Sequence, residues 1–344
     1  MTKKQIPKVK FKKNQDGSNV SKSSDLSKTF DALKHKHYGI YGHHSGIEIC
    51  EWTKKSLRGQ GVCYKQKFYN VDTHRCAQIS PSVVWCQQSC IYCWRPTEYM
   101  TDSKLTGDID DPKEIIDNLF KERIKLLSGF GGYPGISKKK FEEAQVPSHV
   151  AISLSGEPTL YPKLDEMIKY LKTKPEIKTI FLVTNGLCPD VLKKLSKKNV
   201  LPTQLYLSIE APNEDLHKII NRPKIKDSWK KLNQTIRLFP KLNCRKIIRF
   251  TLIKGINDSQ DLIPQYVKLF EKANPDFLEI KSYMHIGSSR KYLKFENMPT
   301  YKECMDFSKS LEKSSSLFKI NDFCKDSRIV LLKNKNSRVR NFIK

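Results

Sequence analysis

The sequence predicts an α/β protein built as an incomplete (βα)6 barrel. Two observations support this prediction: six short runs rich in β-branched or aliphatic residues, and longer segments with helical spacing between them. The runs lie at residues 79–85, 149–154, 178–184, 204–209, 246–253 and 276–281. Strands that alternate with helices are typical of βαβ units, whose strands form a parallel sheet. In such barrels the chemistry takes place at the C-terminal ends of the strands, so we expect functional residues on the loops that follow the runs.

The clearest predicted helix follows Pro112. Its apolar residues recur at steps of three and four, as one face of a helix requires. They are Ile115, Ile116, Leu119, Phe120, Ile124 and Leu127. Further helices are expected at about 162–173, 189–197, 226–238 and 259–273. A last apolar run at 328–333 is expected to add an edge strand.

The ends of the chain and one internal segment are expected to differ from the barrel. Residues 1–30 are rich in Lys, Ser and Asn, which predicts a basic, poorly ordered arm. Residues 31–76 are rich in His, Tyr, Gly and Cys and show little periodicity, so a bound metal could hold this Cys-rich extension in shape. The barrel is assigned to residues 77–335 and a basic tail to 336–344.

The composition predicts a soluble, cytoplasmic protein. The chain has 344 residues, of which 38% are apolar, enough for a sizeable core. No stretch approaches the roughly 18 consecutive apolar residues of a membrane-spanning helix. The basic N-terminus also lacks the apolar segment of a secretory signal. We therefore expect no membrane partner, and we expect a monomer.

The charge is strongly positive. There are 63 Lys and Arg residues against 36 Asp and Glu, a formal net charge of +27. Basic side chains release condensed counterions when they meet phosphates, so this excess favours a polyanionic partner. A compositional bias towards lysine would give the same excess without any such partner.

Ten cysteines in an intracellular chain indicate metal ligation or catalysis before disulfides. Six of the ten fall within residues 50–93, and these are the candidate ligands: Cys50, Cys63, Cys76, Cys86, Cys90 and Cys93. The other four are scattered along the chain and are expected to be small buried residues.

The triplet Cys86, Cys90 and Cys93 has the form CxxxCxxC and directly follows the first predicted strand. Three thiolates on one loop can ligate three irons of a 4Fe–4S cluster and leave the fourth iron open. A zinc site usually needs a fourth ligand, and the bacterial ferredoxin spacing is CxxCxxC, so neither fits well. The pattern resembles the radical S-adenosylmethionine superfamily. The resemblance implies that the open iron binds S-adenosylmethionine, which is cleaved to a 5′-deoxyadenosyl radical.

Further residues match the S-adenosylmethionine-binding pattern of that superfamily at the ends of predicted strands. Gly156 and Glu157, within Ser-Gly-Glu-Pro, resemble the motif that contacts the amino end of the cofactor. Glycine lets the backbone come close, and a carboxylate can accept from an ammonium group. Weaker candidates follow the next strands, for ribose, carboxylate or adenine: Asn185, Ser208, Glu210 and Ile253. Each of these weaker matches could instead be an ordinary strand-ending turn.

The second cysteine set, Cys50, Cys63 and Cys76, has regular spacings of 13 and 13 residues. Three cysteines just before a radical motif predict a second 4Fe–4S cluster with an open iron. Buried thiols are the alternative, but the segment around them shows no core of its own.

With these residues the resemblance becomes specific to one family, the tRNA 4-demethylwyosine synthases in their short archaeal form. It covers about residues 36–335 and depends on the second cysteine set and five runs. The runs are CIYCWRP (90–96), LLSGFGGYPG (126–135), AISLSGEPTLYP (151–162), INRP (220–223) and LIKGIND (252–258).

The family resemblance implies a reaction. The N1-methylguanosine beside the anticodon of tRNA-Phe would be condensed with pyruvate to the tricyclic 4-demethylwyosine, in a lyase reaction that uses two 4Fe–4S clusters and S-adenosylmethionine. Lys65 matches the lysine proposed in the family to bind pyruvate as a Schiff base. Chelation of pyruvate by the second cluster is the alternative.

The partners follow from the same resemblance. Eukaryotic members carry an N-terminal flavodoxin-like domain that is not expected here, so a separate flavodoxin or ferredoxin would supply electrons. Candidate tRNA contacts are Lys138, Lys139, Lys140, Arg338 and Arg340. Three other functions stay open: another radical enzyme acting on RNA, a non-catalytic iron–sulfur electron carrier, and a zinc-dependent RNA-binding module.

Overall fold

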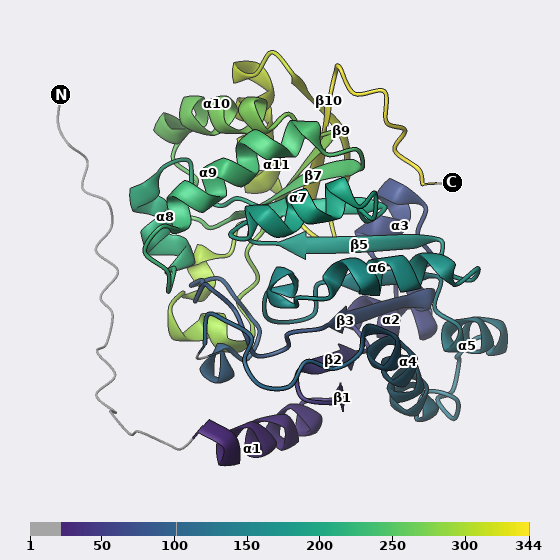
Figure 1. Ribbon diagram of the computed structural model, residues 1–344. Coiled ribbons are helices and arrows are strands. Elements are labelled where there is room, and N and C mark those ends of the chain that lie inside the picture. The colour runs from purple at the N-terminus through teal and green to yellow at the C-terminus, as the bar shows by residue number, and fades with distance from the viewer. Residues whose placement is uncertain (1–21, 101, 344) are drawn as a thin grey trace.

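A single ten-stranded sheet organises the chain (Figure 1). The computed structural model describes residues 22–100 and 102–343. The strands are β1 (Tyr38–Tyr41), β2 (Ser45–Glu48), β3 (Cys76–Ser80), β4 (His149–Ile152), β5 (Thr179–Thr184), β6 (Gln204–Ser208), β7 (Arg245–Leu252), β8 (Phe277–Ser282), β9 (Phe318–Cys324) and β10 (Ile329–Asn334). Strands β3 to β8 are parallel and pair in chain order. This confirms a series of six parallel strands, five of them at their predicted positions. The sheet is open, with antiparallel strands β1 and β9 at its edges.

Helices connect the parallel strands and cover one face of the sheet, here called the outer face (Figure 1). The helices after β3 are α4 (Pro112–Ser128), α5 (Lys138–Gln145), α6 (Leu164–Thr173), α7 (Pro189–Lys197), α8 (Glu214–Asn221), α9 (Ser228–Leu238), α10 (Ile263–Ala273) and α11 (Tyr301–Ser314). Six of them pack on the outer face, whereas α5 packs beside α4, and α8 packs on the loop that contains Ile91. From residue 22 onwards, three more helices precede β3: α1 (Lys22–His35), α2 (Glu51–Leu57) and α3 (Tyr64–Tyr69). The five predicted helices are confirmed as α4, α6, α7, α9 and α10.

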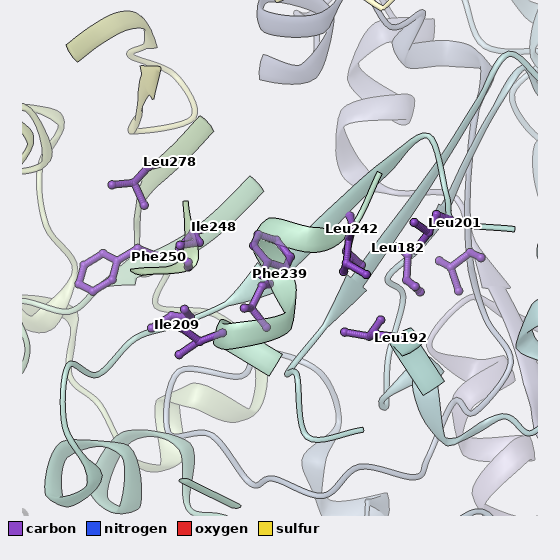
Figure 2. Close-up of a cluster of buried hydrophobic side chains, with 14 of the residues drawn as sticks. Leu182, Leu192, Leu201, Ile209, Phe239, Leu242, Ile248, Phe250 and Leu278 are labelled. Carbon is purple, nitrogen blue, oxygen red and sulfur yellow. The ribbon is translucent and has the colours of Figure 1, made fainter. Parts of the chain in front are cut away.

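The main core lies between the outer face and these helices. Figure 2 shows part of it, with strand residues Leu182, Ile248 and Leu278 and helix residue Leu192, all fully buried. Burial of each such side chain contributes about 1.5–3 kcal/mol before the entropy of folding is subtracted. Successive strand residues point to opposite faces, so the residues between these leucines and isoleucines face the other way.

The inner face of the sheet is covered by helix α3. Phe68 and Tyr69 of α3 pack on inward-facing residues of the strands, among them Phe181, Tyr206 and Phe277. Tyr69 contacts Phe277 at the start of β8, with ring centroids 6.0 Å apart. The end of α3 therefore lies at the N-terminal ends of the strands. The chain's C-terminal segment closes over the same place, where the backbone N–H of Ile343 donates to the carbonyl of Tyr69 (3.0 Å).

The first barrel strand lies earlier than predicted. It spans Cys76–Ser80, whereas the prediction was residues 79–85. Val83, Val84 and Trp85 are buried, which explains the strand-like apolar run, but they lie in a loop. Pro81 lacks a backbone N–H and so cannot continue the ladder. Consequently Cys76 begins the first strand, and Cys86 follows a loop instead of the strand itself.

The segment before β3 has more structure than the sequence predicted. Residues 22–30, assigned to the arm, form part of α1, whose Leu33 is packed near Trp85. The rest of the arm, residues 1–21, lies outside the described residues. Strands β1 and β2 extend the main sheet, and Tyr64 and Phe68 bury their rings in it. Strands β1 and β2 and helices α2 and α3 escaped prediction because they are four to seven residues long, too short to show a period.

A further difference concerns the other edge of the sheet. The run at 328–333 forms β10 as predicted, but β9, which was not predicted, pairs with it and is the edge strand. In the part of the chain that the structure describes, no helix has the length and apolar character needed to cross a membrane.

Candidate active site

The CxxxCxxC loop lies at the C-terminal ends of the parallel strands. Its backbone is held by the INRP segment at the end of α8: the N–H of Ser89 donates to the carbonyl of Asn221 (3.2 Å), and the N–H of Ile91 donates to that of Ile220 (2.9 Å). Burial raises the pKa of all three thiols, that of Cys86 to about 12. Iron would have to stabilise the thiolates, as coordination does.

Polar groups around this loop fit an iron–sulfur cluster. The side-chain amide of Asn221 points at Cys90 Sγ (3.6 Å) and that of Asn185 at Cys86 Sγ (4.0 Å). Arg95 is buried, its charge lowers the pKa of Cys93, and its NH2 group has no hydrogen-bond partner among the described residues. N–H groups aimed at cluster sulfurs are a usual second shell of such clusters. The donor set therefore suits a 4Fe–4S cluster.

Gly156 and Glu157 join the cluster loop to the sheet. Gly156 has a φ of +69°, and a Cβ there would overlap the carbonyl oxygen of Ser82. The Glu157 carboxylate accepts from the Thr184 hydroxyl (2.7 Å) and the Asn185 backbone N–H (2.8 Å), and also from Thr159. Burial raises the pKa of Glu157. Both oxygens thus have protein partners, which gives Glu157 a role in positioning the loops after β4 and β5.

The remaining cofactor candidates lie at the same end of the sheet. Ser208 ends β6, and Glu210 beyond it is buried. Asn221 donates to one oxygen of Glu210 (3.0 Å), while Oε1 has no hydrogen-bond partner among the described residues, and burial raises the Glu210 pKa to about 7. Ile253 follows β7 and shares a buried cluster with Ile91 of the cysteine loop. The structure brings these residues together beside the loop, and their contacts with the cofactor stay predictions.

The second cysteine set lies at the opposite end of β3. Cys50 caps α2, Cys63 caps α3, and Cys76 is the first residue of β3. Thr73, three residues before Cys76, joins the other two: its hydroxyl accepts from the N–H of Cys63 (3.1 Å), and its carbonyl accepts from Thr53 (3.1 Å), whose hydroxyl contacts Cys50 Sγ (3.2 Å). Burial, Cys50 and Cys63 raise the Cys76 pKa to about 12. No three His, Cys, Asp or Glu side chains of residues 22–100 and 102–343 are grouped closely enough to hold a single metal ion. In a 4Fe–4S cluster each thiolate binds a different iron.

Lys65 lies on the inner face, between the two cysteine sets. It follows Cys63 in the first turn of α3. Its Nζ is 4.4 Å from the ring centroid of Phe181 and 5.0 Å from that of Tyr206. These rings belong to the middle residues of β5 and β6, so the amine reaches the middle of the sheet.

Two charged inner-face residues were not predicted. Arg249 donates to Glu279 (2.7 Å) and to the hydroxyl of Tyr64. Lys281 donates to the carbonyl of Ser327 (2.9 Å) and has no ion pair among the described residues, while burial and Arg249 lower its pKa to about 8. The signal was present in the sequence, because Glu279 and Lys281 alternate with apolar residues of the predicted strand.

A third missed residue is Arg123 of helix α4, which is fully buried. Its Nε donates to the carbonyl of Ala144 (3.2 Å) and its NH2 to that of His74 (2.9 Å). NH1 has no partner in the described residues. Burial lowers the Arg123 pKa to about 10, against the opposing effect of Cys76 and Cys50.

The predicted tRNA contacts lie away from the cluster loop. Lys138 and Lys139 are exposed at the start of α5, which precedes β4, and Arg338 and Arg340 are exposed after β10. Both sets are therefore near the N-terminal ends of the parallel strands. A surface hollow of about 520 Å³ lies instead beside the cluster loop. Its lining includes Ser89, Lys218, Arg222, Lys224 and Lys226.

Comparison with known proteins agrees with this geometry. Two family models match: Radical SAM superfamily over residues 138–263, and Wyosine base formation over residues 272–334. The S-adenosyl-L-methionine-dependent tRNA 4-demethylwyosine synthase of Pyrococcus abyssi is 42% identical over 300 residues, which are 87% of this chain and 86% of that protein. The protein of the same name from Methanocaldococcus jannaschii is 40% identical over 315 residues, 90% of this chain and 97% of its own.

A solved structure gives the same result. The structure of TYW1 with a lysine–pyruvate adduct bound matches with a TM-score of 0.81 and 37% identity, and the match covers 92% of this chain and 98% of that one. Sequence and fold agree over almost the whole length of the archaeal relatives. The chain therefore belongs to the tRNA 4-demethylwyosine synthase family of radical S-adenosylmethionine enzymes.

Proposed function

We propose that this chain condenses N1-methylguanosine of tRNA-Phe with pyruvate to form 4-demethylwyosine. The observation that carries the proposal is the position of Lys65, whose amine reaches the middle of the inner face between two sets of three cysteines. An amine in that position can meet a substrate that also faces the radical-generating end of the sheet. A non-catalytic electron carrier would need no such amine.

The first cluster is assigned to Cys86, Cys90 and Cys93. When bound there, S-adenosylmethionine supplies a 5′-deoxyadenosyl radical for hydrogen abstraction from the methyl group of N1-methylguanosine. The chain's own residues hold the site: Asn185 and Asn221 direct amides at the thiols, and Glu157 fixes the loops that would surround the cofactor. The second cluster is assigned to Cys50, Cys63 and Cys76, which lie near Lys65.

Lys65 is the proposed catalytic amine for pyruvate. Attack of its Nζ on the C2 carbonyl, followed by loss of water, gives an imine that fixes the keto acid on α3. The rings of Phe181 and Tyr206 beside Nζ shield this bond from water on the side of the sheet. The related structure with a lysine–pyruvate adduct supports this assignment.

Lys281 is the proposed site for the carboxylate of pyruvate. The other inner-face cation near Lys65, Arg249, is already paired with Glu279. Lys281 contacts only a backbone carbonyl through its hydrogen bond, and both lysines influence the pKa of Cys63. A carboxylate would therefore give Lys281 the counter-ion that its surroundings lack.

The function is tested by anaerobic reconstitution with iron and sulfide. The protein is then incubated with dithionite, S-adenosylmethionine, pyruvate and tRNA-Phe that carries N1-methylguanosine, and its nucleosides are analysed by mass spectrometry. We expect a tricyclic nucleoside whose formation depends on pyruvate. If 5′-deoxyadenosine forms but the tRNA stays unchanged under all conditions, the radical chemistry holds and the substrate assignment fails.

Replacement of Lys281 by Met is expected to weaken pyruvate binding. A hydrogen bond to a charged group contributes about 1.5–3 kcal/mol, so the KM for pyruvate should rise by about 10- to 150-fold. The KM for S-adenosylmethionine should change far less, because the hydrogen bond and the ring contact of Lys281 involve Ser327 and Tyr64, neither of which is assigned to that cofactor. Lys319→Met, at an exposed position of β9, is the control. Equal pyruvate KM values for both variants would contradict the role of Lys281.

The other partners are part of the same proposal. A small acidic redox protein would reduce the first cluster, and the hollow lined by Lys218 and Lys226 lies beside the cluster loop where such a donor could dock. The lysines of α5 and the arginines of the tail would contact phosphates of the tRNA. A cytoplasmic, monomeric enzyme fits these partners, and each of these statements stays a prediction.

A further inference from the structure

Arg123 is a buried cation that has no carboxylate partner among the described residues. Its side chain is completely inaccessible to solvent, and it takes part in no ion pair there. An isolated charge in the interior is strongly unfavourable unless an anion or enough hydrogen bonds compensate for it. The arrangement therefore needs a compensating group that the protein alone does not supply.

Hydrogen bonding accounts for only part of the guanidinium. Of its three nitrogens, Nε and NH2 donate to the carbonyls of Ala144 and His74, which connect α4 to the segments before β3 and β4. NH1 carries two N–H groups and has no partner among the described residues, although it is fully buried. If Arg123 only joined α4 to these carbonyls, the burial of NH1 without a hydrogen-bond acceptor would be unexplained.

The groups that act electrostatically on Arg123 are the cysteines of the second set. Cys76 and Cys50 both favour its charged form, and Arg123 in turn favours the thiolate of Cys76. The geometry agrees, because the carbonyl of His74 that accepts from Arg123 (2.9 Å) lies only two residues before Cys76 at the start of β3. The thiolates of Cys50 and Cys76, once bound to iron, would carry the charge that the guanidinium lacks.

A comparison with Arg95 makes the difference clear. Arg95 lies beside the first cysteine set and also has one nitrogen without a partner, but it is paired with Glu48 and bonded to the hydroxyl of Tyr38 (3.0 Å). The charge of Arg95 is thus compensated by the protein itself. That of Arg123 is not, which points to the second cluster as its counter-ion.

We propose that Arg123 is a positioning residue for the second cluster: its NH1 would donate to sulfurs of a cluster bound by Cys50 and Cys76, and its charge would balance the anionic cluster. The inference rests on the proposed second cluster. Outer-shell partners of metal ligands typically change metal retention by about 10- to 100-fold. A cation at hydrogen-bond distance also makes the reduced cluster easier to form.

The test uses the full chain with Cys86, Cys90 and Cys93 replaced by Ala, so that only the second set can bind iron. Arg123→Met and Arg123→Lys are made in this background, with Arg237→Met, an exposed position of α9, as the matched control. Iron and sulfide content, loss of iron to a chelator, and the midpoint potential by electron paramagnetic resonance are measured after anaerobic reconstitution. Thermal unfolding of the iron-free proteins reports the structural contribution separately.

We expect Arg123→Met to lose iron to the chelator about 10- to 100-fold faster and to shift the midpoint potential to a more negative value. Arg123→Lys keeps the positive charge but loses the planar set of N–H donors. Its midpoint potential should therefore be close to that of the background protein, whereas its rate of iron loss should stay higher. Arg237→Met should match the background. If Arg123→Met fails to fold, Arg123→Gln, which keeps an N–H donor, takes its place.

The outcomes separate the two levels of the proposal. A background protein that binds iron, together with an Arg123 variant of equal retention and potential, would overturn the role of Arg123 alone. A background protein that binds no iron would overturn the second cluster and this role with it. A variant that differs from the background only in the thermal unfolding of the iron-free protein would mean that Arg123 stabilises the fold and does not act on the cluster.

Discussion

Replacement of Lys65 by Arg is expected to abolish formation of the tricyclic nucleoside while 5′-deoxyadenosine is still produced. Arginine keeps the positive charge over Phe181 and Tyr206 but cannot form an imine with a keto acid, because the guanidinium is not a usable nucleophile at neutral pH. Loss of a covalent nucleophile commonly lowers the rate by roughly 10³- to 10⁶-fold. Cleavage of S-adenosylmethionine takes place at the other end of the sheet and should continue.

The control for this variant lies two residues further along the same helix. Lys67 is exposed and pairs with Asp322 (2.8 Å), a contact that arginine can keep. Lys67→Arg should therefore make the product at the parental rate. Borohydride reduction in the presence of labelled pyruvate should mark the parent and Lys67→Arg, and leave Lys65→Arg unlabelled. Product from Lys65→Arg at the parental rate would instead favour pyruvate bound directly to the second cluster.

Long periodic elements were the predictable part of this fold. Helix α7 spans residues 189–197, the range that its apolar spacing predicted, and β5 begins one residue after its predicted start. Such elements are long enough for the pattern of burial to repeat. The cysteine triplet was equally predictable, because ligands that lie on one loop have a recognisable spacing in the sequence.

Helix α4 shows where a correct element still hides a functional residue. The prediction placed Ile124 on the buried face, but Ile124 is 46% exposed, and the neighbouring Arg123 is completely buried. Arg123 lies four residues after Leu119 and four before Leu127, so it belongs to the apolar stripe by position and not by chemistry. A prediction from apolar periodicity assigns isoleucine, and not arginine, to the buried face of a helix. The periodicity contains no information on a buried partner, such as a cysteine set, that would stabilise an arginine there.

The inner face could not be predicted for a different reason. Lys65, Arg249 and Lys281 come from three elements far apart in the chain. Only the folded sheet brings Lys65 and Arg249 to the ring of Tyr206, and Arg249 and Lys281 to that of Tyr64. Alternation within β8 marks Lys281 as a residue of the inner face, but spacing along the chain carries no signal that joins it to residues of other elements. The resemblance to a known family identified Lys65, but it did not extend to the other two cations.

Replacement of Gly156 by Ala is expected to displace the cluster loop. The added Cβ would overlap the carbonyl oxygen of Ser82 and lie 2.7 Å from that of Trp85, both in the loop that leads to Cys86. The backbone at Gly156 also has a φ of +69°, which L-residues adopt at a cost of about 1–2 kcal/mol. Together with overpacking against backbone, the free energy of unfolding should fall by about 2–5 kcal/mol.

Gly255 provides a matched control, because it has a φ of +75° but no atom within 4 Å of an added Cβ. Gly255→Ala should therefore show only the conformational cost, about 1–2 kcal/mol, and keep its first cluster. With Cys50, Cys63 and Cys76 replaced by Ala, iron content reports the first cluster alone, and thermal unfolding reports stability. We expect Gly156→Ala to lose most of this iron and Gly255→Ala to keep it. Equal stability and iron content in the two variants would mean that the loop can move away from residue 156, so that Gly156 would be needed for the cofactor and not for the loop.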